Sequence, residues 1–242
     1  MLARGIDISK WNHRVNQDGS FAPIDWEALK SAGVDYVILK IGSTPRENGS
    51  KGGLEPTFEM DYAGAKAAGL DVGVYYFTYS TDVAGILRDA EVILGWLEGK
   101  QFEYPIYLDV EDVPKENYYP SQIASPILTE MCLNFCSILQ KAGYYTGLYV
   151  NNEFLFNIMQ TENMLKLFDI WYARYPSSES YEWDPDDVST FVWNTEDYGE
   201  HLGMWQYTRL GVLQPIYGDV DFNYSYKDYP SLIKAQKFNG FK

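Results

Sequence analysis

Two carboxylates, Asp109 and Glu111, end the segment 105–111, which reads PIYLDVE. The β-branched and aromatic residues before them favour a strand, in which residues two apart lie on one face and about 6–7 Å from each other. At that distance the charge of one carboxylate raises the pKa of the other. A carboxyl group with a raised pKa keeps its proton near neutral pH and can act as a general acid. The simpler alternative is an acidic strand end that meets solvent or a helix dipole.

Asp7 and Asp221 follow strand-like segments near the two ends of the chain. In a closed barrel the first and last strands are neighbours, and barrel enzymes act at the carboxyl ends of their strands. We therefore expect both aspartates to approach Asp109 and Glu111. Each taken alone is equally typical of a polar strand or turn residue, and it is the joint placement that favours a site.

The elements that must position these acids alternate between strand-like and helix-like patterns. The order predicts five β/α units and then shorter strands, which favours an α/β, TIM-like barrel with a mainly parallel sheet. We expect a single domain over residues 1–242, with a core at about 3–226 and a tail at 227–242. An open doubly wound sheet is the alternative, but no G-x-G-x-x-G follows the first strand. The predicted strands are 5–9, 36–41, 72–79, 106–111, 145–150, 170–175, 204–208 and 220–223, and the predicted helices are 25–30, 58–68, 82–97, 126–142 and 153–159.

The composition restricts the partners of the chain. The formal net charge of −15 argues against nucleic acids and anionic membrane surfaces, which require clustered basic residues. No apolar run approaches the roughly 20 residues of a membrane span, and the N-terminal residues lack the layout of a signal peptide. Aromatic residues make up 17% of the chain, which suits stacking on the apolar faces of sugars. A neutral polymer is thus the more compatible substrate.

Cysteines and histidines are scarce. Cys132 and Cys136 are four residues apart in a helical pattern, a spacing that fits a disulfide poorly, so we interpret them as reduced core residues. The two histidines, His13 and His201, form no H-E-x-x-H motif. The Gly-rich segment 43–55 lacks the G-x-x-x-x-G-K-[ST] phosphate loop. We therefore expect no metal ion and no cofactor.

A series of short motifs spans nearly the whole chain. In order they are GIDISKW at 5–11, VILK at 37–40, GVYYF at 73–77, YLDVE at 107–111, GLY at 147–149, WYARY at 171–175, WQYT at 205–208 and VDFN at 220–223. In content and order the sequence resembles the glycoside hydrolase family 25 lysozymes, or muramidases, which are common among phage endolysins and bacterial autolysins. It departs from the family at Tyr76, where many members carry histidine, and in the long segment 176–203.

The resemblance implies a flattened (β/α)5β3 barrel that hydrolyses the β-1,4 bond between N-acetylmuramic acid and N-acetylglucosamine. It places the general acid at Glu111 and the supporting acidic positions at Asp109, Asp7 and Asp221. The implied partner is the glycan strand of peptidoglycan, reached at the bacterial cell wall after secretion or phage lysis. The oligomeric state is left open.

Candidate substrate contacts come from the same motifs, although each aromatic ring taken alone is equally typical of a core residue. They are Tyr75, Tyr149, Trp171, Trp205, Phe77 and Lys40. The group that attacks the sugar is also open: a carboxylate, the substrate's acetamido oxygen or water would each suffice. A chitinase-like or endo-N-acetylglucosaminidase barrel is an alternative, but the chain lacks D-x-x-D-x-D-x-E. An inactive peptidoglycan-binding protein is another, and the presence of all four acids argues against it.

Overall fold

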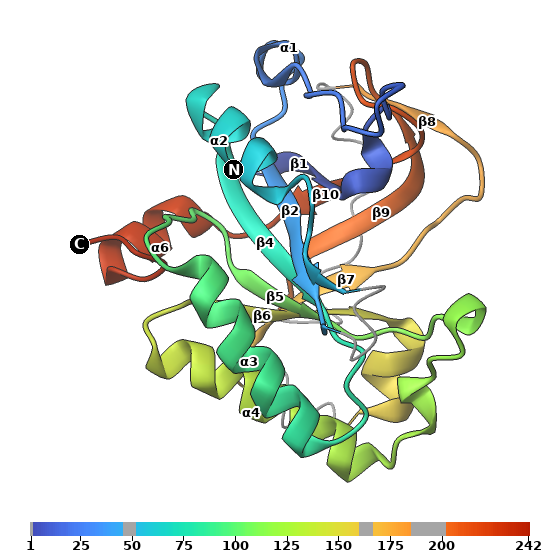
Figure 1. The fold of residues 1–242 in the computed structure, drawn as a ribbon, viewed down its shortest axis with the longest axis vertical. Coiled ribbons are helices and arrows are strands. Elements are labelled where there is room, and N and C mark those ends of the chain that lie inside the picture. The colour runs from blue at the N-terminus through green and yellow to red at the C-terminus, as the bar shows by residue number, and fades with distance from the viewer. Residues whose placement is uncertain (1, 46–51, 160–166, 185–201) are drawn as a thin grey trace.

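The computed structural model describes residues 2–45, 52–159, 167–184 and 202–242, and within them the chain is a single-domain α/β barrel (Figure 1). Two short strands, β3 and β8, extend the sheet beside β2 and β9. The barrel strands are β1 (Ala3–Ile8), β2 (Tyr36–Ser43), β4 (Asp71–Phe77), β5 (Ile106–Asp109), β6 (Thr146–Asn151), β7 (Asp169–Ala173), β9 (Leu202–Val212) and β10 (Val220–Ser225), and the short strands are β3 (Gly53–Leu54) and β8 (Tyr181–Glu182).

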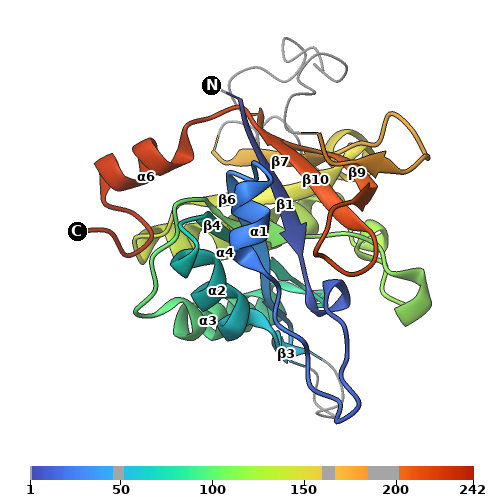
Figure 2. The ribbon, with the colours of Figure 1, turned by 90° about the horizontal axis from the view of Figure 1, so that it is seen from above.

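The barrel closes because β1 pairs with both β2 and β10. Neighbouring strands run parallel from β1 through β2, β4, β5, β6 and β7 to β9, whereas β10 runs antiparallel to both β9 and β1. Figure 2 shows β1 beside β10, where the beginning and the end of the barrel sheet meet. The closure brings Asp7 opposite Asp221, which are register partners on these two strands.

A helical segment follows each of the first five barrel strands, so the predicted (β/α)5β3 order is confirmed. The fifth is a π-helix, where the sequence pattern had predicted an ordinary helix. Short 3-10 turns, η1 (Lys10–Asn12), η2 (Pro114–Glu116) and η3 (Pro120–Gln122), lie in the loops. The five segments are α1 (Trp26–Ser31), α2 (Phe58–Ala67), α3 (Val83–Leu97), α4 (Ser125–Lys141) and η4 (Phe154–Ile158).

The local sequence explains where these helices begin and end. The carboxylates of Asp25 and Asp82 accept hydrogen bonds from backbone N–H groups in the first turns of α1 and α3. Gly33 follows α1 at φ 85°, a left-handed conformation that favours glycine. Cys132 and Cys136 are free and buried on the inner face of α4, as the helical spacing predicted.

The C-terminal segment 227–242 contains a helix that packs against the barrel. Residues Tyr229–Gln236 form α6, whose Tyr229 and Ile233 are fully buried. Beyond the helix, the amide of Asn239 donates to the carbonyl oxygens of Phe102 and Tyr104, both of which precede β5. The tail is therefore part of the barrel structure and covers its amino-terminal end.

Two hydrophobic clusters fill the described structure. The larger lies between the sheet and the surrounding helices. The smaller lies inside the barrel and is rich in rings, including Tyr36, Tyr107 and Trp171, with Tyr229 of α6 at the amino-terminal end. In the described part of the chain, no helix has the length and apolar character needed to cross a membrane.

Candidate functional site

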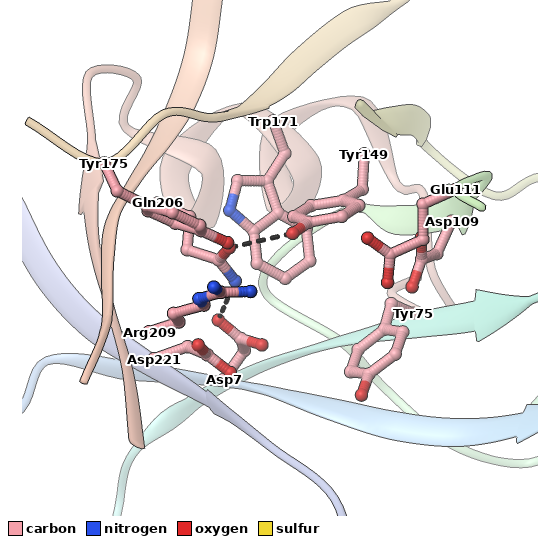
Figure 3. A pocket seen from close by; sticks show the side chains of 10 residues that line it. All are labelled: Asp7, Tyr75, Asp109, Glu111, Tyr149, Trp171, Tyr175, Gln206, Arg209 and Asp221. Carbon is pink, nitrogen blue, oxygen red and sulfur yellow. Dashed lines mark hydrogen bonds between the residues drawn. The ribbon is translucent and has the colours of Figure 1, made fainter. Parts of the chain in front are cut away.

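A pocket of about 200 Å³ opens at the carboxyl ends of the barrel strands (Figure 3). It brings together all four acids that the sequence indicated, together with three of the predicted contact residues. The residues that line it are Asp7, Tyr75, Asp109, Glu111, Tyr149, Trp171, Tyr175, Gln206, Arg209 and Asp221. The acids form two pairs at opposite sides of the pocket, Asp7 with Asp221 and Asp109 with Glu111.

Asp7 sits in a network of side-chain amides. Its Oδ2 accepts hydrogen bonds from Nε2 of Gln206 and Nδ2 of Asn223, both at 2.8 Å. The Oδ1 of Asn223 in turn accepts from the indole Nε1 of Trp171 at 2.8 Å. Because each amide is held at its oxygen as well as its nitrogen, its orientation is set and Asp7 has a defined place in the pocket.

Two tyrosine hydroxyls extend this network to the side-chain amide of Gln206. The Oε1 of Gln206 accepts from the hydroxyl of Tyr149 at 2.8 Å and from that of Tyr175 at 2.7 Å. These contacts fix Gln206 with its nitrogen toward Asp7. Rings at the mouth of the barrel thus orient the carboxylate by way of one glutamine.

Burial and hydrogen bonding act in opposite directions on the first acidic pair. Burial raises the pKa of Asp7 to about 6, while hydrogen bonds from Asn223, Gln206 and Asp221 limit the rise. The pKa of Asp221 is raised well above its usual value by burial and by the negative charges of Asp7 and Glu111. The hydrogen bond between the two carboxyl groups lowers the pKa of Asp7 and raises the pKa of Asp221, so Asp221 is the member of the pair that more readily keeps a proton.

The second pair lacks such support. The Oδ1 of Asp109 is buried and has no hydrogen-bond partner among the described residues. Burial, and then the charge of Glu111, raises the pKa of Asp109 well above its usual value, and burial also raises the pKa of Glu111. The positive charge of Lys40 counteracts both shifts. The pair therefore readily holds a proton, and the half-buried Glu111 is the member that reaches into the pocket.

β5 ends at Asp109, so Glu111 lies beyond the strand that was expected to carry it. Val110 between them is buried, and both carboxylates nevertheless line the pocket. Side chains thus continue to alternate between the two faces of the chain beyond the end of β5. This is why strand periodicity predicted correctly that Asp109 and Glu111 face the same way.

Lys40 and Phe77 lie next to the pocket without lining it. The Nζ of Lys40 lies 5.8 Å from the ring centroid of Tyr75 and 5.4 Å from that of Phe77. Phe77 is buried against Tyr79 and Tyr118. Lys40 therefore acts on the acids by its charge, and the Phe77 ring packs against the lysine.

Trp205 was expected to contact the substrate, but the structure places it away from the pocket. Its indole is buried in the larger cluster, beside Tyr207 and Tyr224, and its Nε1 donates to the carbonyl of Arg174. Adjacent residues on a strand face opposite sides, so with Gln206 facing inward Trp205 must face outward. The same rule applies to Tyr76, which donates a hydrogen bond to Asp89 of α3 on the outside of the barrel.

Four functional residues were missed by the motif reasoning: Tyr175, Gln206, Arg209 and Asn223. A signal existed for one of them: Asn223 is two residues after Asp221, so period-two counting along the last strand would have found it. For Gln206 the same counting depends on which side Trp205 faces, and that becomes known only from the structure. Arg209 lies with its guanidinium 5.6 Å from the Tyr175 ring centroid, a placement that depends on tertiary contact.

The described residues contain no group of three or more histidine, cysteine, aspartate or glutamate side chains arranged to hold a metal ion. His13 is engaged elsewhere: its Nε2 lies 3.1 Å from Oδ2 of Asp61 in a buried pair. His201 lies outside the described residues.

Comparisons with known proteins agree with this architecture. The family model for glycosyl hydrolases family 25 matches residues 6–216. Among solved structures, the CTP1L endolysin superimposes with a TM-score of 0.70 at 21% identity, over 96% of this chain and 70% of that one. The modular autolysin LytC from Streptococcus pneumoniae, in complex with a synthetic peptidoglycan ligand, also gives 0.70 at 23% identity.

This chain spans about half of LytC, since the match covers 93% of this chain and 47% of that one. The bacterial lysozyme from Streptomyces coelicolor matches with a TM-score of 0.68 at 19% identity, over 93% and 92% of the two chains. At these identities the structural likeness establishes the fold. A comparison with curated proteins finds no match.

Proposed function

Because this chain belongs to glycosyl hydrolases family 25, and is thus a lysozyme-type glycoside hydrolase that acts on peptidoglycan, we propose that Glu111 is its general acid. The proposed bond is the β-1,4 linkage between N-acetylmuramic acid and N-acetylglucosamine. The observation that carries the proposal is the pocket itself, where Glu111 reaches in beside Asp109 and opposite Asp7 and Asp221.

The first chemical step is proton transfer. Glu111 donates its proton to the glycosidic oxygen as the C1–O bond breaks, and the bonding electrons leave with that oxygen. The positive charge that develops at C1 is stabilised by the carboxylates of Asp109 and Asp7. Water then supplies the oxygen that completes C1, and its proton returns to Glu111.

The fate of C1 between these steps depends on which group attacks it. Direct attack by water inverts the configuration, whereas an intermediate formed with a carboxylate or with the substrate's acetamido oxygen retains it. The family resemblance favours retention. NMR of freshly released reducing ends separates the two outcomes, because the anomers have distinct signals.

The aromatic residues divide into two roles. Tyr149 and Trp171 are 8% and 1% exposed and use their polar atoms within the Asp7 network, so we assign them to holding the acids. Tyr75 is only half-buried and lines the pocket next to Lys40. We propose that Tyr75 contacts the sugar directly.

Purified cell walls provide the test. We expect soluble fragments with new reducing ends that mass spectrometry identifies as muramic acid, and no such release by the Glu111→Gln variant. Glucosamine at the new ends would identify an N-acetylglucosaminidase instead. Binding of walls without any new reducing end would identify an inactive binding protein.

The proposed place of action is the bacterial cell wall, with peptidoglycan strands as the partner. The net charge of −15 supports a neutral glycan over nucleic acid or an anionic membrane surface. Delivery by secretion or by phage lysis stays a prediction.

A further inference from the structure

A second cavity, of about 430 Å³, lies at the same end of the barrel and has about twice the volume of the acid pocket. Its walls come from the segment after β1, from β2 and β3, and from η2 after β5. The residues that matter for its chemistry are Lys10, Trp11, Lys40, Glu55 and Glu116. The proposed glycosidic chemistry uses none of the five except Lys40.

Lys40 connects the two cavities. It lines the second cavity, while its Nζ lies 5.8 Å from the centroid of the Tyr75 ring, which lines the acid pocket. Its charge also lowers the pKa of both Asp109 and Glu111. The two cavities therefore lie next to each other at this lysine, close enough for one ligand to contact both.

Trp11 gives the second cavity an exposed aromatic wall. Its side chain is 77% exposed although the surrounding turn is well ordered by hydrogen bonds. Ser9 and Asn12 cap each other's backbone, the Asn12 amide donates to the carbonyl of Asp219, and buried Glu55 accepts from the N–H of Lys10. Because these contacts fix the backbone that carries Trp11, only side-chain freedom is lost when the ring binds a ligand.

The charges around the cavity have both signs. Lys10 and Lys40 contribute two ammonium groups, and the Nζ of Lys10 lies 5.2 Å from the centroid of the Trp11 ring. Glu55 and Glu116 also line the cavity, and Oε1 of Glu55 accepts the backbone N–H of Lys10. The exposed ring and the two ammonium groups suit a ligand that carries carboxylates and small apolar parts.

We propose that this second cavity binds the short peptide that muramic acid carries on its lactyl group, an inference that rests on the proposed function. Such a peptide offers alanine methyl groups to the Trp11 ring and carboxylates to Lys10 and Lys40. N-acetylglucosamine has no lactyl group and no peptide. The cavity therefore lets the enzyme select muramic acid by its substituent, in addition to its sugar ring.

The test compares two substrates that differ only in the peptide: purified glycan strands, and the same strands after an amidase has removed the peptides. We expect Trp11→Ala to lower kcat/KM on peptide-bearing strands at least about fivefold more than on stripped strands. Lys10→Glu should act in the same direction, because it reverses a charge that faces the carboxylates.

Tyr217→Ala is the matched control. Tyr217 is 52% exposed, has the Arg14 guanidinium 5.6 Å from its ring centroid, and lines neither cavity. It should leave the ratio of the two kcat/KM values unchanged. Melting temperatures of all variants check that the folded state persists.

The outcomes separate the inference from the proposed function. If Trp11→Ala lowers kcat/KM equally on both substrates, Trp11 contacts a sugar and peptide recognition is overturned. If neither Trp11→Ala nor Lys10→Glu lowers kcat/KM on either substrate, peptide recognition is overturned as well. If wild-type protein cleaved neither strand preparation, the proposed function itself would fail. Cleavage with muramic acid ends and a selective loss in the variants supports both.

Discussion

Each acidic pair in the pocket combines a buried aspartate with a half-buried acid, but the two buried aspartates differ in what surrounds them. Asp7 accepts hydrogen bonds from two fixed amides and from Asp221. Asp109 has a buried oxygen with no partner among the described residues. One pair is held in place by the protein, whereas the other interacts mainly through charge.

This difference assigns the pairs to different tasks. Amide donors stabilise the ionised form of Asp7, so this carboxylate can face a developing positive charge without moving. The second pair gains little from the protein when ionised, and it therefore keeps a proton that Glu111 can deliver. Burial alone would not have separated these roles.

The strongest test of this division is Glu111→Gln. Loss of the proton donor should reduce wall hydrolysis by at least ~10²–10⁴-fold, while the isosteric amide preserves the packing. Activity on purified walls and the circular dichroism spectrum are the measurements. A folded variant with near wild-type turnover would remove Glu111 from the proposed role.

Breaking the amide network should have the next largest effect. Gln206→Met removes one charge-assisted donor to Asp7 and should lower kcat by roughly 10–100-fold. Because that hydrogen bond favours the ionised carboxylate, its loss should raise the pKa of Asp7, and the acidic limb of the pH–rate profile should move to higher pH.

Trp205→Phe is the control on the neighbouring, outward-facing residue. Its kcat and pH profile should match those of the wild type even if the melting temperature falls. An identical response of the two variants would mean that the network has no specific role.

Asp109→Asn tests the coupling within the second pair. Removing the negative charge beside Glu111 should lower the pKa of Glu111, so the alkaline limb of the pH–rate profile should move to lower pH. We also expect an approximately tenfold loss of kcat/KM, because a stabilising carboxylate is removed. If the alkaline limb stays in place while activity falls, Asp109 acts on the sugar and does not set the proton affinity of Glu111.

Asp109→Asn and Asp7→Asn should also change how the stability of the folded protein depends on pH. A carboxyl group whose pKa is raised by folding contributes stability at pH values below its unfolded pKa, and this contribution is lost as the pH rises through the folded pKa. For Asp7 that window runs from the ordinary value of 3.8 to about 6. Asp109→Asn, which removes the more strongly shifted group, should therefore raise the melting temperature at pH 8 by about 2–4 °C.

The gain from Asp109→Asn should shrink at pH 5, and Asp7→Asn should gain less at pH 8. Differential scanning calorimetry of both variants at the two pH values provides the comparison. Equal gains at both sites would indicate that the amide network does not distinguish the pairs.

The smallest expected effect is that of chelation. The proton transfer proposed for Glu111 requires no metal ion, and Lys40 and Arg209 supply positive charge beside the acids. EDTA should leave the rate of wall hydrolysis unchanged. A loss that Ca²⁺ or Mg²⁺ restores would contradict this prediction.

The four acids of the pocket could be predicted from the sequence. Strand periodicity and the closure of a barrel predicted that Asp7, Asp109, Glu111 and Asp221 converge, because both depend on local pattern and topology. Periodicity at 205–208 shows only that Trp205 and Gln206 face opposite sides of β9; the structure places Gln206 in the pocket and Trp205 outside the barrel.

Other features depend on packing that no local pattern encodes. The helix α6 is short, so its sequence alone does not indicate that it packs against the barrel. In the structure its Tyr229 and Ile233 lie inside the barrel. The position of Arg209 over the ring of Tyr175 likewise joins β9 to the segment after β7, and neither sequence alone indicates the other.

The pairing of β1 with β10 has a consequence for how the protein is made. β1 pairs with β10, which follows it by more than 200 residues, and Tyr229 and Ile233 of α6 pack against the rings inside the barrel. A ribosome must therefore synthesise β10 before the barrel can close, and contacts of such high sequence separation form slowly. Because β10 carries Asp221, a chain that has emerged only as far as β9 cannot assemble the four acids, and we expect a newly made hydrolase to gain activity only after β10 has emerged.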